Sequence, residues 1–198
     1  MKTQILAIVV VLVPPAVARA QDPVQLQKLF ESGKYQQVVD AATAEALPAA
    51  TYLAAQSQQK LGATASALEL YARLASQPEG DPWRLIGESA RQLLQDNLDA
   101  ALASAQQAVG IAGNVPEAHY QLGLVAAKRQ DWLAAAQAFD RAAELNPTLA
   151  YAHYYGGLSH YRSNRPDQMA IHFDQFLKLA PEAPERPEVQ QIMKTVRR

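Results

Sequence analysis

The sequence predicts an all-α fold, a right-handed α-solenoid of stacked helix-turn-helix repeats. Prolines recur at an interval of 34 residues, at positions 48, 82 and 116 and again at positions 147 and 181. Between them, apolar residues recur three and four positions apart, which is the spacing of one face of an α-helix, and there is no alternation of period two. An interval of 34 residues accommodates two helices and a turn, so one helical hairpin is repeated along the chain.

Four blocks align without gaps when they begin at Pro48, Pro82, Pro116 and Ala150. The last two blocks agree best, with ten identical residues in 34. Unrelated sequences of ordinary composition would share roughly two. The agreement indicates that the blocks share one structure.

The second helix of each block carries an apolar stripe. Three positions, spaced i, i+4 and i+7, lie on one face of the helix and are expected to be buried. The first of them is small in three blocks, which lets two antiparallel helices approach at the short end of the usual spacing of about 8–10 Å. The stripe positions are Ala67, Tyr71, Leu74, Ala101, Ala105, Ala108, Ala135, Phe139, Ala142, Met169, Phe173 and Phe176.

The third block resembles the tetratricopeptide repeat, a family whose 34-residue pattern is an aromatic residue, then Leu-Gly, then Tyr, Ala, Phe and Pro. The resemblance spans residues 48–183 and implies stacked helical hairpins. The matching residues of the third block are Leu122, Gly123, Ala135, Phe139, Ala142 and Pro147, whereas His119 and Ala126 stand where the family has tryptophan and tyrosine.

The other blocks depart from the family pattern in their first helices. Gly156 replaces the leucine of the fourth block, and we expect the missing side chain to loosen that helix. Glu88 replaces it in the second block, where Trp83 also lies two positions early, so we expect that helix to be rotated or shifted. In the first block, Ala54 and Ala55 stand in place of the Leu-Gly pair.

Partial units flank the four blocks. Residues 21–47 form a truncated first repeat that Gly33 interrupts, and residues 184–198 form an amphipathic helix that caps the stack, because the end of a repeat array would otherwise expose an apolar face. Asp81 is predicted to cap the helix that Pro82 opens. Gly110 is predicted to end the preceding helix in a left-handed conformation.

Residues 1–20 have the features of a cleavable signal peptide. Lys2 precedes nine apolar residues, and the small-residue site Ala18-Arg19-Ala20 follows. Nine residues are too few for a membrane span, which needs about 20, so we expect cleavage after Ala20 and no transmembrane segment afterwards. An uncleaved anchor is the alternative. The chain has no cysteine, hence no disulfide, and export without cysteine favours the bacterial periplasm.

Charge argues against a nucleic-acid partner. Residues 1–20 contain two basic and no acidic side chains, so the remaining chain has 16 basic and 19 acidic ones. Binding to phosphates requires a concentrated basic surface, which this balance does not provide.

The sequence shows no catalytic constellation. A Gly-x-Ser-x-Gly turn and a glycine-rich phosphate loop are both missing, so we expect no catalytic residue, no cofactor and no enzyme activity. His153 and His160 lie two helical turns apart, roughly 10 Å, which is too far to share one metal ion. His119 and His153 occupy the same position in adjacent blocks, which favours packing, and no metal is expected.

The resemblance places a binding surface on the concave side, which the first helix of each repeat lines in this family. Tyrosines suit such a surface because they bury a large ring while the hydroxyl still finds a partner, although aromatic rings at helical spacing also pack in cores. The partner-binding candidates are Tyr52, Tyr120, Leu124, Lys128, Tyr151, Tyr154, Tyr155, Leu158, Tyr161 and Arg162.

The leading hypothesis is a non-enzymatic protein–protein interaction scaffold of the bacterial cell envelope, which holds a peptide or helix of a partner in an aromatic groove. One alternative is an accessory subunit of an envelope enzyme-maturation complex, such as one of cytochrome c biogenesis. Self-association through the last helix and a glycan-binding module are the others. The sequence leaves the partner and the oligomeric state open.

Overall fold

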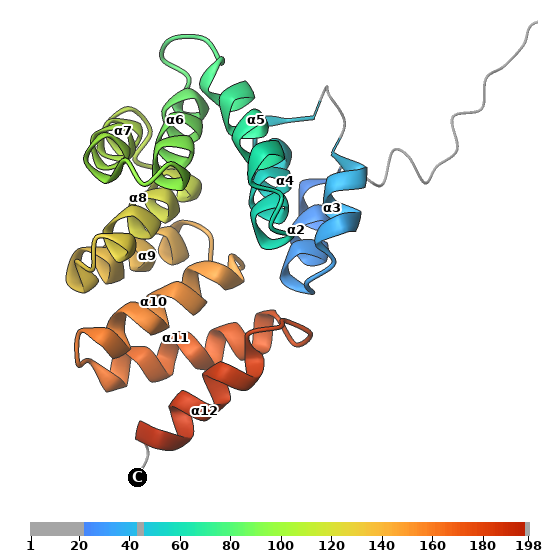
Figure 1. Cartoon of the computed structure of the whole chain (residues 1–198). Helices are drawn as coiled ribbons and strands as arrows, with labels where there is room; N and C mark the ends of the chain where they lie inside the picture. Colours follow the sequence, from blue (N-terminus) through green and yellow to red (C-terminus); the bar gives the residue numbers. More distant parts are fainter. Residues whose placement is uncertain (1–21, 43–45, 197–198) are drawn as a thin grey trace, which may run out of the picture.

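The computed structural model describes residues 22–42 and 46–196, so the predicted signal peptide lies outside the described residues. The described residues form eleven α-helices and no strand, which confirms the all-α prediction (Figure 1). None of these helices is both long enough and apolar enough to cross a membrane. The helices are α2 (Pro23–Glu31), α3 (Tyr35–Ala41), α4 (Pro48–Lys60), α5 (Thr64–Ala75), α6 (Pro82–Leu94), α7 (Leu98–Ile111), α8 (Pro116–Lys128), α9 (Trp132–Leu145), α10 (Ala150–Arg162), α11 (Pro166–Leu179) and α12 (Arg186–Val196).

The helices pack as a solenoid of consecutive hairpins. After α2 and α3 come the pairs α4–α5, α6–α7, α8–α9 and α10–α11, and each helix of these four pairs packs against the next along the chain. Figure 1 shows that the stack curves. All twelve stripe residues of the second helices are at most 2% exposed, so the predicted stripe is the contact between the two helices of each hairpin and their neighbours.

Glycine in the first helix allows the closest of these contacts. A Cβ atom on Gly123 would lie 2.7 Å from the ring of Phe139, and one on Gly157 would lie 2.5 Å from the ring of Phe173. Both distances are shorter than van der Waals contact. In the third and fourth blocks, the glycine of the first helix therefore makes room for the aromatic ring of the second helix.

The second block keeps the common register, so the predicted rotation or shift of its first helix was wrong. Helix α6 begins at Pro82, as α4 and α8 begin at their prolines, and Ile86 is buried at the position that Tyr120 occupies in α8. Leu85 and Ile86 supply the apolar contact that Glu88 cannot. The Glu88 side chain remains at the edge, where it accepts a hydrogen bond from Gln92 at 3.4 Å.

Of two predicted helix boundaries, one is confirmed. The carboxylate of Asp81 accepts a hydrogen bond from the backbone N–H of Trp83 at 2.9 Å and caps α6. Gly110 does not end α7, because the N–H of Ala112 still bonds to the carbonyl of Ala108 and the helix runs to Ile111. The prediction for Gly110 was therefore wrong.

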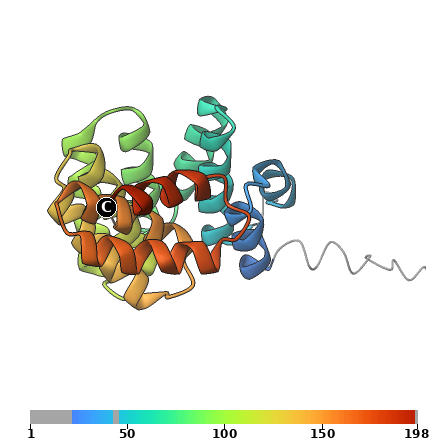
Figure 2. The ribbon, with the colours of Figure 1, turned by 90° about the horizontal axis from the view of Figure 1, so that it is seen from below.

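The two ends of the array meet. Glu31 at the end of α2 accepts a hydrogen bond from the backbone N–H of Ala150 at 3.1 Å. Lys34 forms an exposed ion pair of 3.5 Å with Glu182, in the loop that leads to α12. Seen from below, α2 and α3 lie beside this loop, and α12 runs next to α11 (Figure 2). The partial first unit therefore touches the last hairpin as well as α4.

Helix α12 packs against α11 through its apolar side. Val189 and Met193 are buried and Ile192 is half-buried, whereas Val196 is 37% exposed. The residues expected to form the apolar face of the last helix therefore lie against the array, except for Val196 at its end.

Candidate functional site

A groove runs along the inner side of the curved stack. It consists of two hollows of about 370 Å³ and about 530 Å³, which share Phe30, Gln56, Tyr120 and Tyr151. Most of the lining side chains come from α2, α4, α6, α8 and α10, the first helices of the hairpins. We refer to the two hollows together as the central groove.

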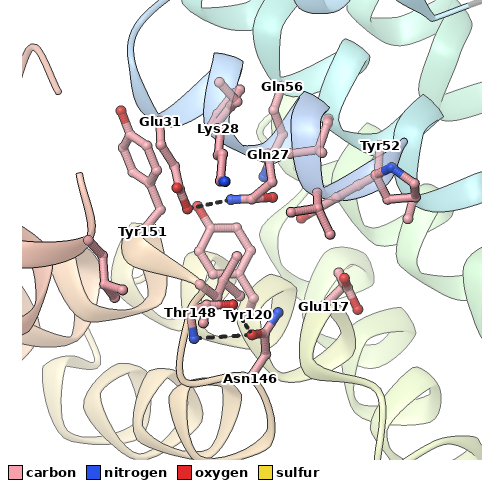
Figure 3. A pocket seen from close by; sticks show the side chains of 17 residues that line it. Gln27, Lys28, Glu31, Tyr52, Gln56, Glu117, Tyr120, Asn146, Thr148 and Tyr151 are labelled. Carbon is pink, nitrogen blue, oxygen red and sulfur yellow. Dashed lines mark hydrogen bonds between the residues drawn. The ribbon is translucent and has the colours of Figure 1, made fainter. Parts of the chain in front are cut away.

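The first hollow is acidic and lies between α2, α4, α8 and the start of α10 (Figure 3). Gln27 donates a hydrogen bond to Glu31 at 2.8 Å, and this carboxylate also holds the N-terminus of α10. Burial raises the pKa of both Glu31 and Glu117 above the ordinary value for glutamate. Among the described residues, only Lys28 contributes a cationic side chain to the lining of this hollow.

Two lysines line the second hollow, and each is paired with a carboxylate. Lys60 forms an ion pair with Glu185 at 2.8 Å and lies 5.3 Å from the centre of the Tyr151 ring. Lys128 forms a more exposed ion pair of 3.3 Å with Asp96. Leu93, Leu94, Leu124 and Tyr155 supply the apolar lining. The central groove therefore has an acidic hollow at one end and lysines at the other.

Aromatic rings form the floor of the groove and pack mostly edge to face. Phe30 lies 5.1 Å from Tyr151, and Tyr120 lies 6.0 Å from Tyr155. Their hydroxyl groups are largely engaged within the chain: Tyr52 donates to Gln121 at 2.7 Å and Tyr151 donates to Glu185 at 2.7 Å. Burial raises the pKa of Tyr52, Tyr120 and Tyr151, so these phenols are neutral.

Six of the ten partner-binding candidates line the groove. Tyr52, Tyr120 and Tyr151 are buried in its floor, while Tyr155 and Leu124 are half-buried and Lys128 is exposed at the rim. The rings of the floor thus contact each other as well as the hollow, as expected for aromatic residues that also belong to the core.

The other four candidates lie elsewhere. Tyr154 is buried against Phe176 and donates to Glu188 of α12 at 2.8 Å. Leu158 packs against the core, and Tyr161 is exposed near the end of α10. Arg162 lies 5.8 Å from the centre of the Trp132 ring. These side chains do not line either hollow.

The sequence did not indicate what α2 contributes. Phe30 and Glu31 line the groove because the curvature of the array brings the partial first unit to α10. No periodic pattern encodes this contact, since the residues are 119 positions apart. Gln56 and Lys60 also line the groove and lie on the same face of α4 as Tyr52.

One group of side chains among the described residues could hold a metal ion. It consists of Asp140, His160 and His172, whose ligand atoms lie within 4.8 Å of one another, and it is outside the groove. His119 and His153 instead make equivalent hydrogen bonds in their two repeats, to the carbonyl oxygens of Gly113 at 3.0 Å and Pro147 at 3.3 Å.

Comparison with known families agrees with this architecture. The tetratricopeptide repeat family matches residues 116–149, the helices α8 and α9 with the turn that follows them. Helices α8 and α9 therefore form a tetratricopeptide repeat, as the sequence of the third block indicated. Repeats of this kind generally serve protein–protein interaction, which suggests a scaffold.

Solved structures of similar fold match most of this chain. A thermophilic tetratricopeptide repeat protein of Thermus thermophilus is 20% identical with a TM-score of 0.64, over 88% of this chain and 99% of that one. MamA is 18% identical with a TM-score of 0.50, over 73% and 84%. MamA of Desulfovibrio magneticus RS-1 is 19% identical with a TM-score of 0.50, over 83% and 89%. Identities this low show the fold alone. No curated protein matches the chain.

Proposed function

We propose that this protein is a non-enzymatic scaffold of the bacterial cell envelope that binds a peptide segment or helix of a partner protein in the central groove. The observation that supports the proposal is the groove itself: two connected hollows with an aromatic floor, lined by the first helices of successive hairpins. Location in the envelope rests on the signal-like residues 1–20.

The chemistry of the groove favours a polypeptide with mixed side chains. Apolar lining residues such as Leu53 and Leu124 can receive apolar side chains of a partner. Glu117 at one end can pair with a cationic side chain, and Lys128 at the other can pair with an anionic one. A partner segment with a basic and an acidic end separated by apolar residues would match this arrangement.

The tyrosines favour a polypeptide over a glycan. Sugar binding uses the exposed flat face of an aromatic ring, whereas Tyr52, Tyr120 and Tyr151 are buried against other rings. The hydroxyl groups of Tyr52 and Tyr151 are already hydrogen-bonded within the chain. Protein contact at the half-buried edges of the groove requires none of these groups to be released.

Site-specific photo-crosslinking tests the proposal. A photoreactive residue is placed at Val24 or Leu124, which line the first and second hollows, and at the exposed Lys178 of α11 as a matched control outside the groove. We expect one partner to be crosslinked from both groove positions and not from the control. A partner crosslinked equally well from all three positions, or from position 178 alone, would contradict the groove assignment.

A charge reversal gives a second measurement on the identified partner. Lys128→Glu changes an exposed rim residue, so the fold should remain intact, and we expect roughly a tenfold loss of affinity in a direct binding assay. Lys178→Glu makes the same change of charge outside the groove and should bind like the wild type.

The location of the mature chain is tested by N-terminal sequencing of the protein from the periplasm. Its sequence should begin at Gln21.

A further inference from the structure

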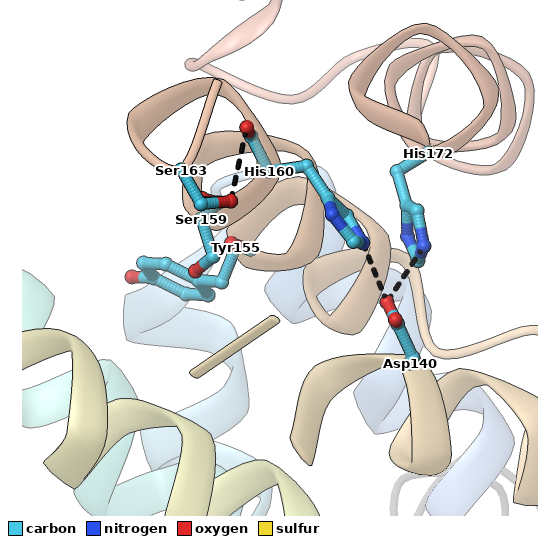
Figure 4. A network of polar contacts seen from close by, with 6 residues as sticks. All are labelled: Asp140, Tyr155, Ser159, His160, Ser163 and His172. Atoms are coloured by element: carbon cyan, nitrogen blue, oxygen red, sulfur yellow. Dashed lines mark hydrogen bonds and ion pairs between the residues drawn. The ribbon is translucent and has the colours of Figure 1, made fainter. Parts of the chain in front are cut away.

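Two histidines converge on one carboxylate oxygen between the third and fourth hairpins (Figure 4). Nε2 of His160 lies 2.9 Å from Oδ1 of Asp140, and Nε2 of His172 lies 3.0 Å from the same oxygen. The three residues come from α9, α10 and α11, and the histidine side chains are 1% and 9% exposed. Three consecutive helices therefore present three potential ligand atoms to one point.

The cluster is specific to this pair of hairpins. One repeat earlier, the positions of His160 and His172 are occupied by Ala126 and Ala138. A bulky imidazole at position 172 needs space, and Gly156 provides it, because a Cβ atom there would lie 2.8 Å from Nδ1 of His172. The equivalent of Gly156 in the third block is Leu122. Leucine and alanine in one repeat are thus replaced by glycine and histidine in the next.

This exchange corrects the expectation that Gly156 loosens the first helix of the fourth block. The ring of His172 fills the space that a leucine side chain would occupy, and Gly156 is buried. The His172 ring is further held between those of His153 and His160, with 5.2 Å between ring centres on each side. Packing thereby fixes the direction of its Nε2 atom, although Nδ1 of His160 and of His172 has no hydrogen-bond partner.

We propose that Asp140, His160 and His172 bind a divalent transition-metal ion of the Zn²⁺ class, which joins the third and fourth hairpins. Two imidazole nitrogens and one carboxylate oxygen are ligands that Zn²⁺, Co²⁺ and Ni²⁺ accept. Asp140 is 36% exposed, so the ion can enter from its side and retain water in the remaining coordination positions.

The spacing of the ligand atoms fits such an ion. Bonds of about 2.0–2.1 Å in a tetrahedral site place neighbouring ligand atoms roughly 3.3 Å apart. The two nitrogen–oxygen distances of 2.9 and 3.0 Å would have to lengthen by only a few tenths of an ångström. Binding would replace the two contacts of the histidines with Asp140 by three metal–ligand bonds, since all three ligand atoms already lie within 4.8 Å of one another.

Titration with Zn²⁺ and Co²⁺ tests the site, using the full chain without a polyhistidine tag. We expect one Zn²⁺ ion to bind per chain in calorimetry, and Co²⁺ to give visible absorption bands that Zn²⁺ abolishes. At a Zn²⁺ concentration a hundredfold above Kd, the Tm should rise by roughly 5 °C or more relative to protein in chelator.

Two variants locate the ion and one serves as the control. Asp140→Asn and His172→Gln each remove a ligand while keeping a similar volume, and each should lower the Zn²⁺ affinity at least tenfold and remove the Tm shift. His119→Gln changes a histidine in the preceding repeat, outside the cluster, and should bind like the wild type. Circular dichroism of each variant in chelator verifies that the fold is retained.

The proposal fails if the wild type binds no stoichiometric ion. It also fails if folded Asp140→Asn and His172→Gln both retain wild-type affinity, since the ion would then occupy another site. Should either variant be unfolded, the comparison of wild type with His119→Gln and the Co²⁺ spectrum still decide, because two nitrogens and one oxygen give a spectrum distinct from that of hydrated Co²⁺.

Discussion

At the scale of single residues, glycine and aromatic side chains act as matched pairs. Gly123 faces Phe139, Gly157 faces Phe173 and Gly156 faces His172, so in each pair one residue lacks the side chain whose space the other fills. The family pattern contains Gly123 and Phe139, but the contact between the two residues of each pair was seen only in the structure. The sequence could not indicate the third pair, because Gly156 departs from that pattern and the compensating residue lies on the second helix of the hairpin.

We predict that a larger residue at position 123 destabilises the protein. Gly123→Ala should lower the free energy of unfolding by about 1–3 kcal/mol, because the new methyl group would lie 2.7 Å from the Phe139 ring. Gly110→Ala is the matched control: it lies inside α7 with no atom near its added Cβ, and should raise stability by about 0.5–1 kcal/mol. Urea unfolding of both variants gives the comparison, and equal effects would contradict the pairing.

Glu117 predicts a dependence of stability on pH. Burial raises the pKa of its carboxyl group in the folded state, so folding favours the protonated form. At pH values below the pKa that Glu117 has in the unfolded chain, the group costs no stability. As pH rises through its higher pKa in the folded protein, the free energy of unfolding decreases. Glu117→Gln should therefore be more stable than the wild type at pH 7, and the advantage should shrink as pH falls from the raised folded pKa towards the ordinary value of 4.5. Thermal unfolding between pH 4 and pH 8 measures this.

A control separates this effect from a general gain in net charge. Glu144→Gln removes an exposed carboxylate from α9 and should show a smaller change that varies little over the same pH range. If the two variants had the same pH profile, the burial of Glu117 would not be the cause.

At the scale of helices, the periodic part of the structure was predictable and the irregular part was not. The buried stripes follow from positions such as Ala135 and Phe139, because a helix has one period and the repeat copies it. The predicted end at Gly110 was wrong because a glycine in a helical context can remain helical. The shift predicted for α6 was wrong because Leu85 and Ile86 compensate for Glu88, a local exchange that no pattern specifies.

We predict that the apolar side of α12 stabilises the protein. Val189 is fully buried, so Val189→Asp should destabilise the protein by roughly 3 kcal/mol, because the new charge would have no partner in the core. Val196→Asp places the same residue on the same helix at a position that is 37% exposed, and should change stability by less than about 0.5 kcal/mol. Chemical denaturation distinguishes the two. Equal losses would mean that α12 does not cap the array.

At the scale of the whole molecule, the inner contacts decide how open the groove is. Lys60 of α4 bonds to Glu185 across 125 positions of sequence, and Glu185 also accepts the hydroxyl of Tyr151. Six of the ten candidate residues line the groove because the family pattern identifies the inner face. Which of them are covered depends on side chains from both ends of the chain, and single long-range contacts leave no periodic signal in a sequence.

We predict that loss of the ion pair between Lys60 and Glu185 opens the array. Lys60→Glu would place two carboxylates side by side, so we expect the array to open and the radius of gyration in solution X-ray scattering to increase. Lys178→Glu makes the same change of charge on the exposed side of α11 and should leave the scattering curve unchanged. Superimposable curves for both variants would show that the ion pair does not hold the two ends together.

The meeting of the first and last units has a consequence for how the array comes apart. A linear stack of repeats frays from its termini, because a terminal unit has a neighbour on one side only. Here α2 is held by α4 on one side and by the N-terminus of α10 on the other. Neither extremity can peel away independently, so local opening of one should expose the other, and proteases should find fewer early cleavage points than in an unjoined stack of equal length.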